Sequence, residues 1–239
     1  MTTSNNSMKS TFWRGFRNGL PFILVVAPFG TLFGVAATEA GMDILQVMSF
    51  SVLVIAGAAQ FSALTLLIED APTVIILLTS LAVNLRMAMY SAALVPHFGK
   101  LRTRLKLLIS YFLVDQAYAM GIKEYDANPE QPIENKVAYF FGIMLATAPF
   151  WYISTYLGAA LGASIPEAFS LDFAVPICFI ALIAPMLRTI PHIITAFVSV
   201  ALALSLAWVP YSLGLIIAAI LAMMSGAYAE LKLGVENDT

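Results

Sequence analysis

The chain has 239 residues, of which 60% are hydrophobic and 11% are charged, and its formal net charge is −2. A soluble domain carries about 25% charged residues, so this composition excludes an ordinary soluble protein, and the charge gives no sign of a nucleic-acid partner. The single Cys178 excludes an intramolecular disulfide and a cysteine-rich metal site. We therefore expect a protein that lies mostly in a lipid bilayer.

Hydrophobic segments follow one another along the chain, and most approach the length of about 20 apolar residues that a spanning helix needs. About eight are visible, at 18–38, 44–68, 72–97, 105–122, 137–160, 170–187, 191–208 and 210–231. The first follows three basic residues, as in a signal peptide, but it is too long for one and we interpret it as a retained helix. The sequence predicts an all-α polytopic membrane protein with a single transmembrane domain over 1–239.

The second and sixth segments are not expected to form continuous helices. Between two apolar arms, the second carries the small and polar stretch Gly57-Ala58-Ala59-Gln60, and the sixth contains Pro176 and Pro185. Proline removes a backbone donor and bends a helix, and irregular backbone at membrane depth is tolerated where it is buried in protein or lines a cavity. We predict that both segments are broken, and the sequence leaves open whether they turn back or cross.

The distribution of Lys and Arg predicts the orientation. If the two broken segments are re-entrant, both termini, the basic cluster at 100–106 and Arg188 lie in the cytoplasm. The loop at 123–136, where Lys123 and Lys136 are balanced by acidic residues, then lies outside.

A faint internal repeat accompanies this topology. The sequence Ala-Pro-Phe at 27–29 recurs at 148–150, and Pro72 is matched by Pro191. The candidate repeat halves are 12–97 and 137–208, and the expected topology inverts one relative to the other. Inverted halves are a recurring plan in transporters, with the site between broken helices. Coincidence in a chain rich in Ala and Phe is an equal alternative.

Polar side chains inside the apolar segments are the candidate functional residues. Asn84 and Arg86 lie in the third segment, and Asp115 and Gln116 lie in the fourth, with tyrosines nearby. A charge at bilayer depth is costly and usually has a partner and a function. Arg presents a planar fork that suits a carboxylate, and Asp115 is the candidate for proton coupling or for binding an ammonium group.

Gly57 and Gln60 complete the predicted substrate site, because a break beside them frees backbone amides and carbonyls. Three alternatives stay open. Arg86 and Asp115 can form a purely structural ion pair, Arg86 can extend to the membrane surface, and the small residues can serve only close helix packing.

Several familiar motifs are missing from the chain. It has no Gly-x-x-x-x-Gly-Lys-Ser/Thr phosphate loop and no His-Glu-x-x-His metal motif. His97 and His192 are far apart and lie near segment ends, which is more typical of hydrogen-bonded or interfacial histidines than of metal ligands. We expect no metal, no cofactor and no catalytic residues.

Short motifs between residues 12 and 120 together resemble one family. They are Gly15-Phe16-Arg17-Asn18-Gly19-Leu20-Pro21-Phe22, Pro28-Phe29-Gly30, Ala56-Gly57-Ala58-Ala59-Gln60-Phe61, Val83-Asn84-Leu85-Arg86, Tyr90-Ser91-Ala92-Ala93-Leu94 and Asp115-Gln116-Ala117-Tyr118. This set is similar to the AzlC-type branched-chain amino acid permeases of bacteria. The resemblance implies the large subunit of a two-component exporter in the plasma (inner) membrane, paired with a small hydrophobic AzlD-type subunit. It implies no residue roles.

We therefore expect a secondary transporter that exports valine-like amino acids and is driven by the proton gradient. A channel with re-entrant half-helices is one alternative, and a membrane enzyme acting on lipid-like substrates is another, although no catalytic arrangement is visible. A non-transporting scaffold subunit is the last, and it would tolerate the loss of both Arg86 and Asp115.

Overall fold

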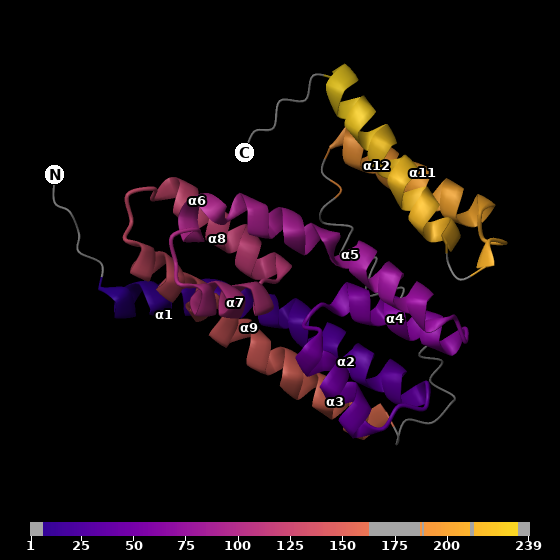
Figure 1. The fold of residues 1–239 in the computed structure, drawn as a ribbon, viewed down its shortest axis with the longest axis horizontal. Coiled ribbons are helices and arrows are strands. Elements are labelled where there is room, and N and C mark those ends of the chain that lie inside the picture. Colours follow the sequence, from indigo (N-terminus) through magenta and orange to yellow (C-terminus); the bar gives the residue numbers. More distant parts are fainter. Residues whose placement is uncertain (1–6, 163–186, 188, 211–212, 234–239) are drawn as a thin grey trace. The chain divides into compact units, whose positions relative to one another are not determined.

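The structure is a computed structural model that describes residues 7–162, 187, 189–210 and 213–233. Within these residues the regular elements are helices (Figure 1). The chain divides into two compact units, one comprising 1–64 and 80–169 and the other comprising 65–79 and 170–239. Most of the predicted sixth segment, with its two prolines and Cys178, and Arg188 lie outside the described residues.

Four stretches of helix are long and apolar enough to cross a membrane. The first covers 32 residues and consists of α1 (Met8–Gly19), η1 (Leu20–Phe22) and α2 (Ile23–Glu39). The others are α5 (Thr73–Ala93), α9 (Ile133–Gly162) and α12 (Leu213–Leu233). These helices confirm the prediction of an all-α polytopic membrane protein.

In the first unit, α1 and α2 run alongside α9 in the same direction (Figure 1). A Cβ on Gly15 would lie 2.3 Å from the Tyr139 carbonyl oxygen, and one on Gly34 would lie 2.2 Å from that of Thr155. Glycine is therefore required at both places, because the two backbones approach too closely for a side chain. The continuous stretch α1–α2 and the helix α9 begin at the same end of the unit, which we call the proximal end. Both finish at the opposite end, which we call the distal end.

The second predicted segment is a hairpin of two short helices, α3 (Ile44–Leu53) and α4 (Gly57–Ile68). Phe50 of α3 contacts Phe33 of α2, and Gly57 at the start of α4 lies against Phe29, nearer the proximal end. Phe61, one turn into α4, contacts Phe33 again. The chain thus enters from the distal end and turns back at Val54–Ala56, so the predicted break is confirmed. We call this the distal hairpin.

The fourth predicted segment differs from the prediction. In place of one helix over 105–122 the structure has α7 (Thr103–Tyr111) and α8 (Asp115–Ala127), separated by an irregular stretch at 112–114. Asp is a poor residue inside a helix but stabilises a helix at its first turn, where the helix dipole is positive. Asp115 occupies that first turn, so it begins α8 and does not lie in the middle of a span.

α8 returns to the proximal end. Its residues pair in parallel order with α5 and with the short α6 (Val95–Phe98): Asp115 meets Arg86, Tyr118 stacks on Tyr90, and Tyr125 contacts Phe98. With 9 and 13 residues, α7 and α8 measure about 14 and 20 Å, too short to cross a hydrocarbon core of about 30 Å. Together they form a second re-entrant element, which we call the proximal hairpin.

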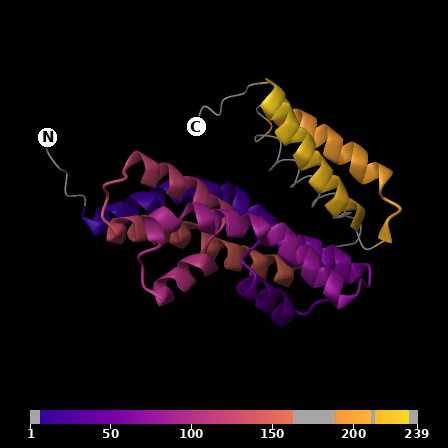
Figure 2. The ribbon, with the colours of Figure 1, turned by 45° about the horizontal axis from the view of Figure 1, so that its top comes forward.

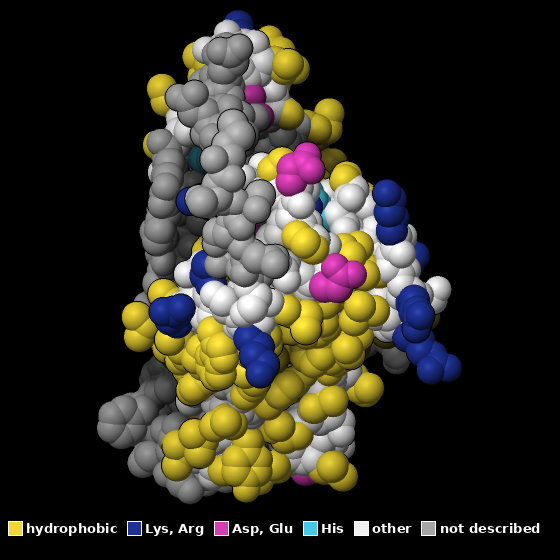
Figure 3. All heavy atoms as spheres, turned by 90° about the vertical axis from the view of Figure 1, so that its left-hand side faces the viewer, with side chains coloured by type: hydrophobic (Ala, Val, Ile, Leu, Met, Phe, Trp, Pro, Cys, Tyr) yellow, Lys and Arg dark blue, Asp and Glu magenta, His cyan; other side chains and the backbone are white. Residues whose placement is uncertain are grey.

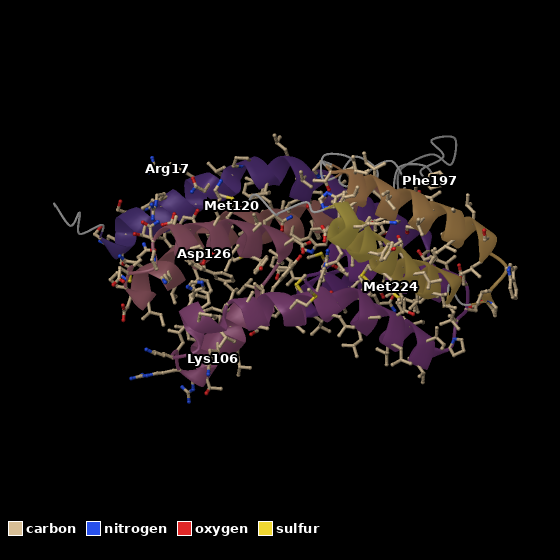
Figure 4. The ribbon with its side chains drawn as sticks, turned by 90° about the horizontal axis from the view of Figure 1, so that it is seen from above. Arg17, Lys106, Met120, Asp126, Phe197 and Met224 are labelled. Carbon is tan, nitrogen blue, oxygen red and sulfur yellow. The ribbon has the colours of Figure 1, made fainter. Side chains whose placement is uncertain are left out.

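The expected topology is therefore wrong at the loop 123–136. Arg14 of α1 pairs with Glu124, and Lys136 bonds to His97, so this loop lies at the proximal end with the N-terminal helix. Figure 4 shows Arg17, Lys106 and Asp126 at this same end, and Figure 3, which views it end-on, shows Lys and Arg side chains on both flanks of a group of acidic ones. The proximal hairpin removes one crossing, which is why the loop changes sides.

The same packing bears on the predicted inverted repeat. The two copies of Ala-Pro-Phe lie in α2 and α9, with Pro28 and Pro149 inside these helices. These helices run parallel, whereas the first helices of inverted halves would run antiparallel. The inverted relation between 12–97 and 137–208 is not found in this pair, and the second half continues into the sixth segment, outside the described residues.

In the second unit, α11 (Ile190–Ser205) and α12 pack side by side in opposite directions (Figure 2). Thr195 lies against Gly226, and Leu206 lies against Gly214. These helices match the predicted seventh and eighth segments within a few residues. Many large apolar side chains on them are exposed, among them Phe197 and Met224, as expected for surfaces that face lipid or another subunit.

Candidate functional site: the meeting point of two hairpins

The tips of the two hairpins meet beside the middle of α9. Ile55, in the break between α3 and α4, packs against the apolar cluster that contains Leu113 and Ala117 of the proximal hairpin. The Tyr111 hydroxyl, at the end of α7, donates to the Val52 carbonyl at 2.5 Å and lies 3.0 Å from the hydroxyl of Tyr152 on α9. Two breaks that enter from opposite ends therefore lie close together at membrane depth.

Each hairpin places the start of a helix at this point. α4 begins at Gly57 and α8 begins at Asp115, and the first backbone amides of a helix attract negative charge. A Cβ on Gly57 would lie 2.6 Å from the Phe29 ring and 3.0 Å from the Trp151 ring, so aromatic rings cover the start of α4. The start of α8 carries its own carboxylate instead.

Arg86 and Asp115 form an ion pair at the proximal tip. Arg86 Nη1 lies 3.0 Å from Asp115 Oδ2, and the two side chains keep 34% and 43% of their surface accessible. Tyr90 lies beside the Asp115 carboxylate, and its ring stacks on Tyr118 with centroids 4.1 Å apart. Arg86 thus reaches towards Asp115 and not to the membrane surface. Because a charge in a bilayer is costly, accessible charges here require a polar path, a ligand or a covering subunit.

The pair leaves hydrogen-bonding capacity unused. Arg86 Nε and Asn84 Oδ1 are both buried without a hydrogen-bond partner among the described residues. One is a donor and the other an acceptor, and an unpaired buried polar atom costs about 1–3 kcal/mol. Gln116 follows Asp115 in the first turn of α8 and is partly buried. The four predicted residues Asn84, Arg86, Asp115 and Gln116 thus lie on two helices, α5 and α8, which the ion pair joins.

A separate polar group occupies the distal hairpin. The Gln60 side chain is fully buried, its amide Nε2 donates to Ser51 Oγ at 3.2 Å, and the Ser51 hydroxyl donates to Thr155 Oγ1 at 3.3 Å. Gln60 Oε1 and Trp151 Nε1 have no hydrogen-bond partner among the described residues. The structure thus places the predicted Gly57 and Gln60 in an enclosed group, distinct from the accessible ion pair.

A hollow beside the proximal tip has apolar walls. Its volume is about 190 Å³, and its lining includes Leu94, Ile109 and Leu113, with the polar Ser91, Ser110 and Lys106. A cavity of about 150 Å³ is already large enough to bind benzene. The hollow extends from the proximal end, at Gly99, to Leu113, two residues before Asp115.

The sequence pattern did not identify several residues of this region. Ser51 bonds to Gln60 and to Thr155, Trp151 lies against Gly57, and Tyr152 contacts Tyr111. Hydroxyl side chains in membrane helices commonly bond to the backbone of their own helix, so their identity gives no signal of a contact between helices. Tyr111 and Tyr118 differ, because they are the tyrosines near Asp115 that the sequence already indicated.

A third polar cluster lies at the proximal end of the unit, where Lys136, His97 and Asp126 are neighbours. Lys136 is buried, and its ammonium donates to the Pro129 carbonyl at 3.1 Å and lies 3.2 Å from His97 Nδ1. Burial and the Lys136 charge lower the pKa of His97, and Asp126 beside Nε2 opposes this shift. His97 is hydrogen-bonded, as its position in the sequence indicated. Among the described residues no cluster of His, Cys, Asp and Glu could hold a metal ion.

The chain is similar to several known membrane proteins. The chain is 27% identical to the inner membrane protein YgaZ of Escherichia coli K12 over 178 residues, 72% of this chain and 71% of YgaZ. An uncharacterized membrane protein of Helicobacter pylori 26695 is 26% identical over 176 residues, 72% of this chain and 75% of its own. One of Archaeoglobus fulgidus is 27% identical over 186 residues, 76% of this chain and 78% of its own.

No solved structure matches this chain. The family model described as AzlC protein matches residues 21–165, a range that contains both hairpins, the Arg86–Asp115 pair and the Gln60 group. The chain is therefore a membrane protein of the AzlC family.

Proposed function

We propose that this protein is a secondary transporter that exports branched-chain amino acids across the bacterial inner membrane. The observation that carries the proposal is the Arg86–Asp115 pair, which lies at membrane depth where two re-entrant hairpins from opposite ends meet. Broken helices around a central polar site are a recurring arrangement in secondary transporters. The resemblance of this chain's motifs to those of branched-chain amino acid permeases supports this choice of substrate.

A zwitterionic amino acid with an apolar side chain matches the groups at the proximal tip. Its carboxylate would bind Arg86, whose Nε is unpaired, or helix-start amides. Its ammonium would bind Asp115 and the Asn84 carbonyl oxygen, with Gln116 beside them. Its branched side chain would lie against the apolar walls that end at Leu113. Gly57 and Gln60 then contribute only when the distal hairpin moves.

Asp115 is the proposed site of proton coupling. Its carboxylate has three competing partners, namely Arg86, the substrate ammonium and a proton. If a proton and the substrate bind to Asp115 alternately, the movement of one is linked to the movement of the other. Accessible surface on the pair gives both of them a path.

The charges of the first unit support a cytoplasmic proximal end. Apart from Arg86, its basic residues lie at that end, whereas Glu39 and Asp43 lie at the distal end. By the positive-inside rule the N-terminus is then cytoplasmic, and we propose the same side for the C-terminus. The accessible ion pair and exposed apolar helix faces support a small hydrophobic partner of the AzlD type, which would cover part of this surface.

The test is transport of radiolabelled valine into inverted membrane vesicles with and without a proton gradient, normalised to the amount of protein. Arg86→Gln and Asp115→Asn should each abolish most uptake, because either change leaves an unpaired charge at membrane depth. The double variant removes both charges. We expect it to be made in normal amounts and to remain inactive, whereas near-normal uptake with unchanged pH dependence from pH 5.5 to 8 would reduce the pair to a structural role.

A channel is the second candidate, favoured by the two opposed hairpins. It would carry valine only down its gradient, so accumulation against a gradient excludes it. If the protein is a scaffold subunit, Arg86→Gln and Asp115→Asn should leave the valine flux unchanged. Coexpression with the small partner tests the remaining part of the proposal, since full transport by this chain reconstituted alone would contradict it.

A further inference from the structure

Tyr111 joins the two hairpins through a directed chain of hydrogen bonds. Its hydroxyl donates to the carbonyl of Val52 in the last turn of α3. A tyrosine hydroxyl has one hydrogen to donate, so the bond between Tyr111 and Tyr152 must be donated by Tyr152. The order is Tyr152 to Tyr111 to Val52, and it connects α9, the proximal hairpin and the distal hairpin.

The Val52 carbonyl has a physical reason to accept this bond. The last carbonyls of a helix have no partner within the helix, and α3 ends at Leu53. Such a carbonyl is costly at membrane depth, where water is scarce. The opposing hairpin supplies the missing donor, so the Val52 carbonyl has a partner within the protein while the two tips are together.

We propose that Tyr111 is a positioning residue that latches the two hairpin tips together, and that transport requires this latch to open and close. The proposal rests on the proposed transport function. Tyr111 lies four residues before Asp115, across the irregular stretch 112–114, so its bond fixes the place of Asp115 opposite Arg86. Tyr111 is 38% exposed, and water can take over its bonds when the tips part.

The first experiment compares Tyr111→Phe with Tyr156→Phe, a matched control in which the same hydroxyl is removed from a tyrosine of α9 that is 51% exposed. No hydrogen bond to Tyr156 is found among the described residues. Valine flux is measured in inverted vesicles both down and against its gradient, per amount of protein. Tyr111→Phe should lower accumulation against the gradient while downhill flux stays equal or rises, because the tips part without completing the cycle. The control should behave as the unmodified protein.

The second experiment measures how often the two hairpin tips separate, and it does not depend on transport. Ile55→Cys, in a Cys178→Ser background, places a thiol in the distal break, and its rate of reaction with a small thiol reagent reports opening. Tyr111→Phe should raise that rate about two- to tenfold, the factor that loss of one hydrogen bond gives, and Tyr156→Phe should not change it.

The outcomes separate the latch from the transport proposal. Equal reaction rates in the Tyr111 and Tyr156 variants overturn the latch, and so does a Tyr111→Phe protein that is no longer inserted in the membrane, since Tyr111 is then structural. A parallel loss of downhill and uphill flux with unchanged thiol reactivity also overturns it. If the unmodified protein carries no valine, the thiol reaction alone decides on the latch, while the substrate proposal fails.

Discussion

The two hairpins have similar geometry and opposite chemistry. Both enter part of the way, break near the same level and begin a returning helix there. The distal tip is closed by Phe29 and Trp151, and its polar Gln60 is fully buried. The proximal tip carries an ion pair, in which the Arg86 side chain keeps 34% of its surface accessible and the Asp115 side chain 43%. The difference indicates a division of tasks, in which the distal hairpin is a packed support and the proximal hairpin offers charge to a ligand.

The polar groups of the two tips fit this division. In the distal hairpin, Ser51 accepts a hydrogen bond from Gln60 and donates one to Thr155 of α9, which fixes the hairpin against α9. At the proximal tip, Arg86 of α5 pairs with the accessible Asp115 carboxylate, while its Nε has no hydrogen-bond partner among the described residues. Hydrogen bonds between helices stabilise one arrangement at the distal tip, whereas the accessible charges at the proximal tip can bind a further group.

The largest expected effect is an all-or-none difference in sidedness. In a Cys178→Ser background, single cysteines replace the exposed Glu39, Arg102 or Glu130 and are treated with an impermeant thiol reagent on intact cells. Because both ends of the proximal hairpin lie at one end of the unit, Arg102→Cys and Glu130→Cys should react alike, and Glu39→Cys should react from the other side. Labelling of Glu130→Cys together with Glu39→Cys, and not with Arg102→Cys, would refute the proximal hairpin.

A smaller effect compares the packing of the two hairpins. Gly57→Ala adds a methyl group 2.6 Å from the Phe29 ring, and such overpacking costs about 1–3 kcal/mol, which lowers the unfolding midpoint by about 2–12 °C. The matched control is Gly121→Ala in α8, where the nearest atom is a Tyr125 ring carbon at 3.1 Å and alanine favours the helix. The midpoints are measured on purified protein in detergent. Equal midpoints would show that the distal tip is not tightly packed.

The smallest expected effect is a dependence of the unfolding midpoint on pH, which arises from His97 at the proximal end. Because burial and Lys136 lower the pKa of His97 in the folded protein, its stabilising contribution is present above the unfolded pKa of about 6.5 and is lost as the pH falls below that value. Protonation would also repel Lys136 and remove the Nδ1 acceptor. The unfolding midpoint should therefore fall between pH 7 and 5.5 less steeply in His97→Gln than in the unmodified protein or in His192→Gln. A steeper fall in His97→Gln would contradict this account.

Some of this arrangement is predictable from the sequence. The apolar segments locate the spanning helices, and Gly57-Ala58-Ala59-Gln60 marks the distal break, because small residues between apolar arms are typical of one. The break before Asp115 was missed because Phe112, Leu113 and Val114 are as apolar as a continuous span. An acidic residue that begins a helix is a recognised start signal, and here hydrophobicity concealed it. The bond from Ser51, the partner of Gln60, to Thr155 joins residues 104 positions apart, which no local pattern contains.

The glycine contacts between the first helices and α9 also determine when the molecule is completed during synthesis. Ser51 and Thr155 are 104 residues apart, which a ribosome needs about 5–20 s to add. Until α9 emerges, α1 and α2 have no parallel helix against which to pack, and the distal hairpin has no hydroxyl from α9. During this time the helices made before α9 lie in the membrane, and the polar groups of the distal hairpin lack part of their hydrogen bonds. A slow step in the biogenesis of this protein is therefore expected at the insertion of α9.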